Sequence, residues 1–226
     1  MRQSEKRIFL TMGILMIILY ITGVFTGFFL YESSVESTHS EITNLQKQID
    51  GYRQTLEYIR LEQLYMSSPN KEISCKFMLS SIKNIQRDLS YFIKNLPGKL
   101  EIYEKYNGTD PAYENLKRDY MFISLKSWML SLSVKERCNA DIIPILYFYS
   151  RECDKCIEQG FVLDRIREEN PNAFIFTIDF NLNEEWANVI KEAYNIKETP
   201  SLIIGNTTYS GFVDYDELDK TIRNSY

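Results

Sequence analysis

The pattern of apolar and polar positions divides the chain into three stretches. Residues 8–31 form an apolar run without a charged side chain. Between about residues 38 and 138, apolar residues recur at spacings of three and four, which is typical of helices that pack in a bundle or a coiled coil. The rest of the chain alternates short apolar runs with helical patterns. We therefore predict an N-terminal anchor over 1–31, a helical stalk over 32–140 and a mixed domain of the α+β or α/β class over 141–226.

The apolar run at 8–31 has the length of a transmembrane helix. At 1.5 Å per residue it spans about 36 Å, more than a hydrocarbon core of about 30 Å. Arg2, Lys6 and Arg7 precede the run, and Glu32 follows it. The positive-inside rule then predicts a single-pass membrane protein with a cytoplasmic N-terminus and an extracytoplasmic C-terminal domain. A cleaved signal peptide is the alternative, although the run is long for one and no A-x-A-like site follows.

The predicted stalk contains three helices, with apolar stripes over residues 42–59, 75–96 and 113–134. A helix of about 30 residues is roughly 45 Å long. The stalk would therefore hold the C-terminal domain well away from the membrane. The stripe over 42–59 could pair between chains as readily as within one chain, so a homo-oligomer formed through the stalk stays open.

Turn residues set the expected helix boundaries. Ser67-Ser68-Pro69-Asn70 separates the first helix from the second, and Pro97-Gly98 is expected to interrupt the second. Asn107-Gly108-Thr109-Asp110-Pro111 is a strong turn signal. Within it, Asp110 suits the N-cap and Pro111 suits the first position of the third helix.

Two of the four cysteines, Cys75 and Cys138, are placed symmetrically about this turn. The midpoint between them falls at Tyr106–Asn107, so both would lie at the opposite end of an antiparallel helical hairpin. A structural disulfide there would close a loop of roughly 60 residues and stabilise the fold by about 4 kcal/mol. The alternative is a pair of free thiols that act as small buried apolar side chains.

Seven elements can be predicted over 141–226, in the order β-α-β-α-β-β-α. The first strand is a continuous apolar run, as expected for a buried parallel strand. The later elements are bounded by Gly, Pro, Asn and Asp. The predicted ranges are 142–149 (strand), 157–170 (helix), 173–179 (strand), 183–194 (helix), 201–204 (strand), 207–210 (strand) and 214–223 (helix).

The remaining two cysteines form the motif Cys153-Asp154-Lys155-Cys156, which follows the first of these strands and begins the first helix. Thr199-Pro200 lies about 45 residues further on, directly before a hairpin and a last helix. This arrangement resembles the thioredoxin fold over 141–226. The resemblance implies that Thr199-Pro200 is a cis peptide facing the cysteines, where its backbone could pair with an extended substrate.

The motif predicts dithiol–disulfide exchange without an organic cofactor. Cys153 at a helix N-terminus would be the nucleophile, because the helix dipole and free N–H groups stabilise a thiolate. Cys156, one turn further on, would resolve the mixed disulfide. The sequence departs from the thioredoxin pattern at Tyr147, where thioredoxins often have a buried Asp, and at Glu152, where they often have Trp. Lys155 would favour the thiolate, whereas the neighbouring carboxylates oppose it.

Charge and composition narrow the expected partners. The net charge of −5 and the single histidine argue against a nucleic-acid binder and a His-rich metal site. Residues 141–226 carry 16 acidic and eight basic side chains. We expect protein thiols and disulfides as substrates, together with an unidentified redox partner. The alternatives are a metal site at the C-x-x-C, which lacks further ligands nearby, and a membrane-tethered binding or adaptor protein without redox turnover.

Overall fold

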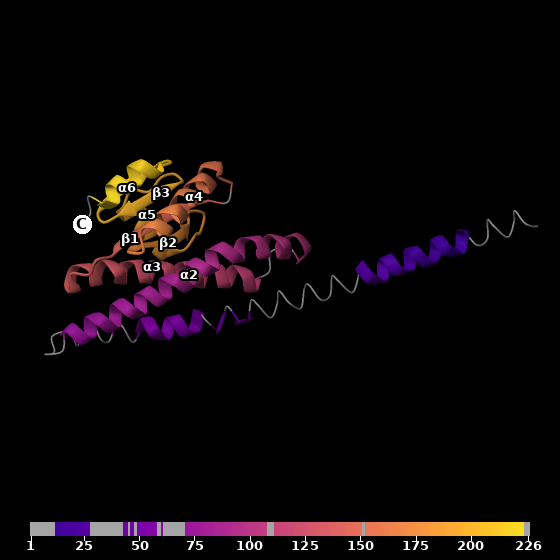
Figure 1. Ribbon diagram of the computed structural model, residues 1–226, viewed down its shortest axis with the longest axis horizontal. Coiled ribbons are helices and arrows are strands. Elements are labelled where there is room, and N and C mark those ends of the chain that lie inside the picture. Colours follow the sequence, from indigo (N-terminus) through magenta and orange to yellow (C-terminus); the bar gives the residue numbers. More distant parts are fainter. Residues whose placement is uncertain are drawn as a thin grey trace, which may run out of the picture. The chain divides into compact units, whose positions relative to one another are not determined.

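The computed structural model describes residues 12–27, 43–44, 46–47, 49–57, 60, 71–107, 111–150 and 152–223, with the backbone alone over 90–107 and 111–113. Contacts divide the chain into two units, Met1–Leu45 and Gln46–Tyr226. Figure 1 shows the described elements as ribbons.

In the first unit, residues 12–27 are helical and carry exposed side chains. The hydroxyls of Thr22 and Thr26 donate to backbone carbonyls one turn earlier, those of Ile18 and Thr22, at 3.0 and 2.8 Å. Within the described residues, no helix is both long and apolar enough to cross a membrane. The predicted span at 8–31 extends beyond the described residues at both ends, and the anchor stays a prediction.

The second unit begins with helices that pack on one another. Residues 49–57 are helical, followed by α2 (Lys71–Asn107) and α3 (Pro111–Cys138). The apolar stripe of α2 is buried at Met78, Ile82, Ile85 and Leu89, as predicted. Helix α2 continues through Pro97–Gly98, so the predicted interruption is wrong. A proline removes one backbone hydrogen bond and bends a helix without having to end it.

The helix over residues 49–57 contacts α2 and α3 of the same chain. The Tyr52 hydroxyl donates to Asp88 of α2 at 2.8 Å, and Arg53 pairs with Asp119 of α3 at 3.0 Å. Ile49 and Leu56 are buried. The described part of the stripe that could have paired between chains, Ile49, Tyr52 and Leu56, therefore packs within one chain in this structure. Ser67–Asn70 and Asp110 lie outside the described residues.

A four-stranded sheet follows, in the order β2-β1-β3-β4, with β1 and β2 parallel and the other neighbours antiparallel. The predicted element order is confirmed. The elements are β1 (Ile143–Tyr149), α4 (Asp154–Glu169), β2 (Ala173–Asp179), α5 (Glu185–Ala193), β3 (Ser201–Ile204), β4 (Thr207–Ser210) and α6 (Tyr215–Arg223). Asp214 accepts a hydrogen bond from the Glu217 N–H at 2.9 Å and so caps α6.

One face of the sheet forms a core with α4 and α6. Strand residues of alternating position point to this face, among them Ile145, Tyr147 and Ile175. Leu163 of α4 and Leu218 of α6 pack against them. Cys156 belongs to the same cluster, so the second cysteine of the C-x-x-C motif packs in this core.

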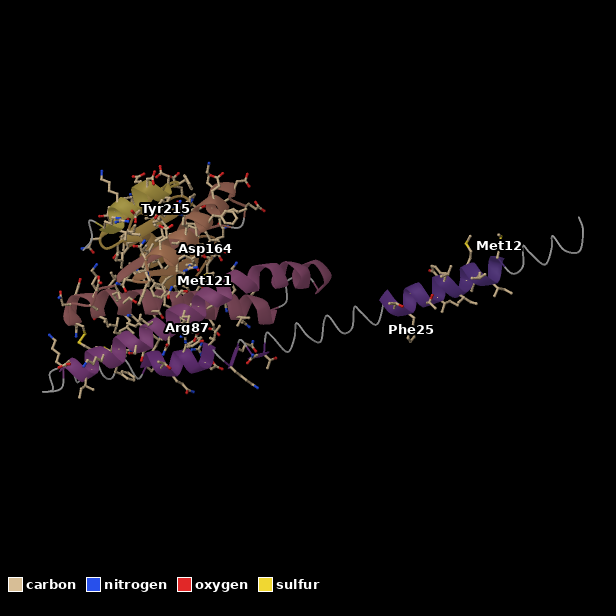
Figure 2. All side chains as sticks on the ribbon, viewed as in Figure 1. Met12, Phe25, Arg87, Met121, Asp164 and Tyr215 are labelled. Atoms are coloured by element: carbon tan, nitrogen blue, oxygen red, sulfur yellow. A yellow bond between two sulfur atoms is a disulfide. The ribbon has the colours of Figure 1, made fainter. Side chains whose placement is uncertain are left out.

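The structure differs from the predicted separate stalk, because α3 packs directly on β1 and β2. The Tyr120 hydroxyl shares a hydrogen bond with Thr177 of β2 at 3.3 Å, and the Asp179 N–H points at the sulfur of Met121 at 3.4 Å. Figure 2 labels Met121. In Figure 1, α2 and α3 lie on one side of the sheet, and α4 and α6 lie on the other. Helix α3 is therefore a layer of the C-terminal domain rather than part of a spacer.

The predicted apolar stripe of α3 is buried at Leu116, Tyr120, Ile123, Leu130 and Val134, but the helix also buries residues outside that stripe. The helix buries Leu116, Ile123 and Trp128 and, in addition, three serines, Ser124, Ser127 and Ser131. Small side chains allow a helix to approach its neighbours closely, yet serines do not register as an apolar stripe. Trp128 also meets Tyr194, just after α5, with ring centroids 5.7 Å apart. Helix α3 thus has buried contacts around much of its circumference.

Candidate active site

The chain leaves β1 at Tyr149 and enters α4 at the C-x-x-C motif. Cys153 is the N-cap of α4, with an extended backbone (φ −139°, ψ 96°). Its Sγ accepts a hydrogen bond from the Cys156 N–H at 3.0 Å. The two cysteines are joined by a disulfide, with Cα atoms 5.2 Å apart. Cys153 is partly exposed, whereas Cys156 is 5% exposed.

This placement makes the two sulfurs unequal. A thiolate on Cys153 would face the free N–H groups and the positive end of the α4 dipole, which lower the pKa of a cysteine. A thiol on Cys156 would lie in the apolar core, where burial opposes ionisation. The arrangement therefore suits Cys153 as the attacking sulfur and Cys156 as the resolving sulfur.

Lys155 is directed along α4 rather than toward Cys153. Its Nζ pairs with Glu158, one turn further on, at 2.7 Å. It also lies 5.3 Å from the ring centroid of Phe212. Glu158 and Phe212 are both exposed, and dissolved salt weakens interactions between exposed charges. The predicted support of the thiolate by Lys155 is therefore shared with Glu158.

Tyr147 lies in the same core cluster as Cys156, at the sequence position where a thioredoxin often carries Asp. The side chain is 6% exposed, and its hydroxyl donates to the Cys156 carbonyl oxygen at 2.8 Å. Burial raises the pKa of this phenol well above its usual range. Tyr147 therefore stays a hydrogen-bond donor at working pH and cannot serve as a proton acceptor.

Thr199–Pro200 is a cis peptide, as the resemblance implied. The Thr199 hydroxyl shares a hydrogen bond with the Ser150 hydroxyl at 2.9 Å, three residues before Cys153. On the other side, the Gly211 N–H donates to the Pro200 carbonyl at 2.8 Å. Gly211 has φ +83°, a backbone conformation that favours glycine. These bonds tie the Thr199–Pro200 segment to the end of β1 and to the segment after β4.

Gln159 is a site residue that sequence reasoning missed. It is fully buried on α4, one turn after Cys156. Its amide nitrogen donates to the Val213 carbonyl at 3.1 Å, and its amide oxygen accepts from the Val213 N–H at 2.8 Å. The only signal in the sequence was a polar residue three positions from Cys156 and four from Leu163, on the buried side of α4. Gln159 fixes the segment that joins β4 to α6 beside the site.

Asp179 ends β2 opposite Tyr149 of β1. Its carboxylate accepts from the Asn181 N–H at 2.9 Å and pairs with Lys117 of α3 at 2.5 Å. Both of its oxygens are thus used at the strand end, which agrees with a capping role rather than a role at the cysteines. Among the residues that the structure describes, no group of three or more candidate metal ligands occurs.

The second cysteine pair, Cys75 and Cys138, forms a disulfide between the first turns of α2 and the last residue of α3. The Cα atoms are 5.7 Å apart, within the reach of an unstrained bridge. Cys138 precedes β1, and Cys153 follows β1. The two disulfides therefore lie at opposite ends of this strand.

No known protein family matches the sequence, and no curated protein matches it. Among solved structures, the chain is similar to thioredoxin-2 of a malaria parasite, described as a component of the protein secretion machinery, with 21% identity and a TM-score of 0.32 over 37% of this chain and 82% of that one. Chloroplastic thioredoxin z is 20% identical, with a TM-score of 0.34 over 42% and 86%. Thioredoxin O2 from Arabidopsis thaliana in the oxidized state is 18% identical, with a TM-score of 0.34 over 43% and 86%.

The C-terminal part of the chain is a thioredoxin-like domain. The strand order, the cis Thr199–Pro200 bond and the C-x-x-C at the start of α4 define it independently of sequence identity. In this fold, the disulfide of Cys153 and Cys156 lies at the start of α4.

Proposed function

We propose that this protein is a thiol–disulfide oxidoreductase that acts on protein thiols and disulfides through Cys153 and Cys156. The observation that carries the proposal is the disulfide at the N-terminus of α4, with one partly exposed and one buried sulfur. No organic cofactor is required, because the electrons reside in the cysteine pair.

Starting from the reduced pair, the Cys153 thiolate bonds to one sulfur of a substrate disulfide, and the substrate S–S bond breaks. The Cys156 thiol then loses its proton, and its sulfur bonds to the Cys153 Sγ as the mixed disulfide breaks. The two released substrate sulfurs take up two protons, one from Cys156 and one from solvent. The substrate gains two electrons and the pair loses two. A dithiol partner reverses these steps on the oxidised pair.

The same proposal includes an extracytoplasmic location. The charge-free run at 8–31, preceded by Arg2, Lys6 and Arg7, supports a single-pass anchor with a cytoplasmic N-terminus. The two disulfides support a compartment in which such bonds persist. We expect the full chain to remain in the membrane after alkaline extraction. Protease added outside sealed cells should digest the C-terminal domain. Release of the intact chain, or full protection of that domain, would contradict this location.

Insulin reduction by the full chain in detergent, with dithiothreitol as electron donor, tests the proposed activity. We expect Cys153→Ser to lower the rate at least about 100-fold, because it removes the nucleophile. The matched control is the double variant Cys75→Ala/Cys138→Ala, which removes the other disulfide and should keep the rate per folded molecule. Equal rates for Cys153→Ser and the parent protein would instead favour a tethered binding protein without redox turnover.

A further inference from the structure

Tyr147 is a buried polar side chain that forms a hydrogen bond to one residue of the redox pair. Its ring packs in the same core cluster as Cys156. Its hydroxyl bonds to the backbone of Cys156 rather than to a side chain. Among the buried side chains that the structure describes, the one carboxylate is Asp179, which pairs with Lys117 at the end of β2. A phenol therefore stands where a thioredoxin often has an acid.

The hydrogen bond from Tyr147 acts on Cys156, whose own N–H group faces Cys153. The Cys156 N–H points at the Cys153 Sγ at 3.0 Å and at the Cys153 carbonyl at 2.9 Å. The Ile157 N–H, which belongs to the peptide group whose carbonyl Tyr147 binds, lies 3.3 Å from the same carbonyl of Cys153. Tyr147 thus binds the first turn of α4 through the Cys156 carbonyl. The N–H groups of Cys156 and Ile157 bind Cys153 within the same turn.

We propose that Tyr147 is a positioning residue that sets the reduction potential of the pair, by fixing Cys156 at the distance and orientation that close the disulfide. The inference rests on the proposed function, since it concerns the same cysteines. A restrained Cys156 has a higher effective concentration toward Cys153, and this favours the disulfide over the dithiol. The phenol does not exchange a proton in any step. It acts only as a donor.

The test compares two tyrosines that each bond to a residue of α4. Tyr147→Phe removes the donor at the N-terminal end of the helix. Tyr215→Phe removes the hydroxyl that donates to Glu169 at the other end (Figure 2 labels Tyr215). The full chain is equilibrated with glutathione buffers, and the oxidised fraction of Cys153–Cys156 is measured by alkylation and mass spectrometry of that peptide.

We expect Tyr147→Phe to lower the equilibrium constant for the disulfide about fivefold, the scale of one net hydrogen bond. Tyr215→Phe should leave this constant unchanged. An unchanged constant for Tyr147→Phe, or an equal shift for Tyr215→Phe, would overturn the inference. A purely structural role of Tyr147 would lower the melting temperature without moving the equilibrium constant.

A second substitution keeps the test decisive if Tyr147→Phe does not fold. Replacing Tyr147 by 3,5-difluorotyrosine preserves the ring and makes the hydroxyl a stronger donor. The equilibrium constant should then rise, and a fall or no change would overturn the inference. Failure of the proposed function gives a different result: Cys153→Ser and the parent would then reduce insulin at equal rates, while the equilibrium constant with glutathione could still be measured and compared.

Discussion

The two disulfides at the ends of β1 are the same chemical bond in different surroundings. Cys75–Cys138 joins residues 63 positions apart, one near the start of α2 and the other at the end of α3. Cys153–Cys156 joins residues three positions apart, at the N-terminus of one helix. The long loop gives the first bond a large effect on the entropy of the unfolded chain. The short loop gives the second bond little such effect, and its position favours a reactive thiolate instead.

The contrast teaches that the location of a cysteine pair, more than its presence, separates a structural bond from a reactive one. Helix α3 connects the two ends. At the end of the sheet where β1 begins, Cys138 of α3 forms the disulfide with Cys75. At the end where β1 stops, Lys117 of α3 pairs with Asp179, the neighbour of Tyr149 in the sheet. The end of β1 near Cys138 is therefore stabilised by a covalent bond, and the end near Cys153 is stabilised by hydrogen bonds and an ion pair.

The largest effect on the free energy of unfolding is expected from the loss of the Cys75–Cys138 disulfide. Substituting both Cys75 and Cys138 by Ala should lower the free energy of unfolding by about 4 kcal/mol, because a loop of roughly 60 residues is no longer closed in the unfolded chain. Urea denaturation measures this loss, and insulin reduction measures the activity of the molecules that remain folded. Comparable stability of the double variant and the parent would show that this bond does not have the structural role.

A smaller effect is expected at Tyr120, where α3 bonds to β2. Burial raises the pKa of Tyr120 to about 12, against the hydrogen bond to Thr177, which lowers it. The unfolded chain loses the phenol proton near pH 10, before the folded chain does. The contribution of Tyr120 to stability is therefore complete below about pH 10 and falls as the pH rises toward 12.

The pKa of Tyr120 differs by about two units between the unfolded and the folded chain, so the free energy of unfolding should fall by about 2.7 kcal/mol across this pH range. Denaturation at a series of alkaline pH values, with the parent and Tyr120→Phe, measures it. The Phe variant should lose less stability between pH 10 and 12 than the parent. Parallel curves for the two proteins would contradict the burial of this hydroxyl between α3 and β2.

The smallest effect on the free energy of unfolding is expected at Gln159, beside the Cys153–Cys156 disulfide. Gln159→Leu has a similar size but leaves the N–H and the carbonyl of Val213 without the two bonds that Gln159 makes. Unpaired buried polar groups cost about 1–3 kcal/mol. Urea denaturation should show a loss of about 2 kcal/mol, and amide hydrogen exchange at Val213 should become faster. Gln159→Glu is a second variant, in which the Val213 N–H keeps an acceptor but its carbonyl loses a donor.

Much of the C-terminal domain could be predicted from its sequence, because its strands are continuous apolar runs bounded by turn residues. The predicted ranges of β2, β3 and β4 coincide with the observed ones. The C-x-x-C at the start of α4 and the two-sided placement of Cys75 and Cys138 about a turn were also readable. The C-x-x-C could be read from spacing along one segment, whereas the symmetric placement of Cys75 and Cys138 favoured a disulfide but left free thiols open until the structure showed the bond.

The packing of α3 and the contacts under the redox pair could not be read in this way. Ser124, Ser127 and Ser131 are buried but polar, so a search for apolar periodicity assigns them to the surface. Tyr147 and Gln159 make their bonds to backbone groups, one of them 54 positions away in sequence. Such partners depend on how elements meet in three dimensions, which a pattern along one element does not contain.

The central claim is that the two disulfides differ in reactivity, and one titration tests it directly. The full chain is equilibrated over a series of glutathione ratios, and the oxidised fraction of each cysteine pair is measured separately by alkylation and mass spectrometry. We expect Cys153–Cys156 to be reduced first, at a more oxidising potential, while Cys75–Cys138 stays closed. Reduction of both pairs together, or of Cys75–Cys138 first, would contradict it.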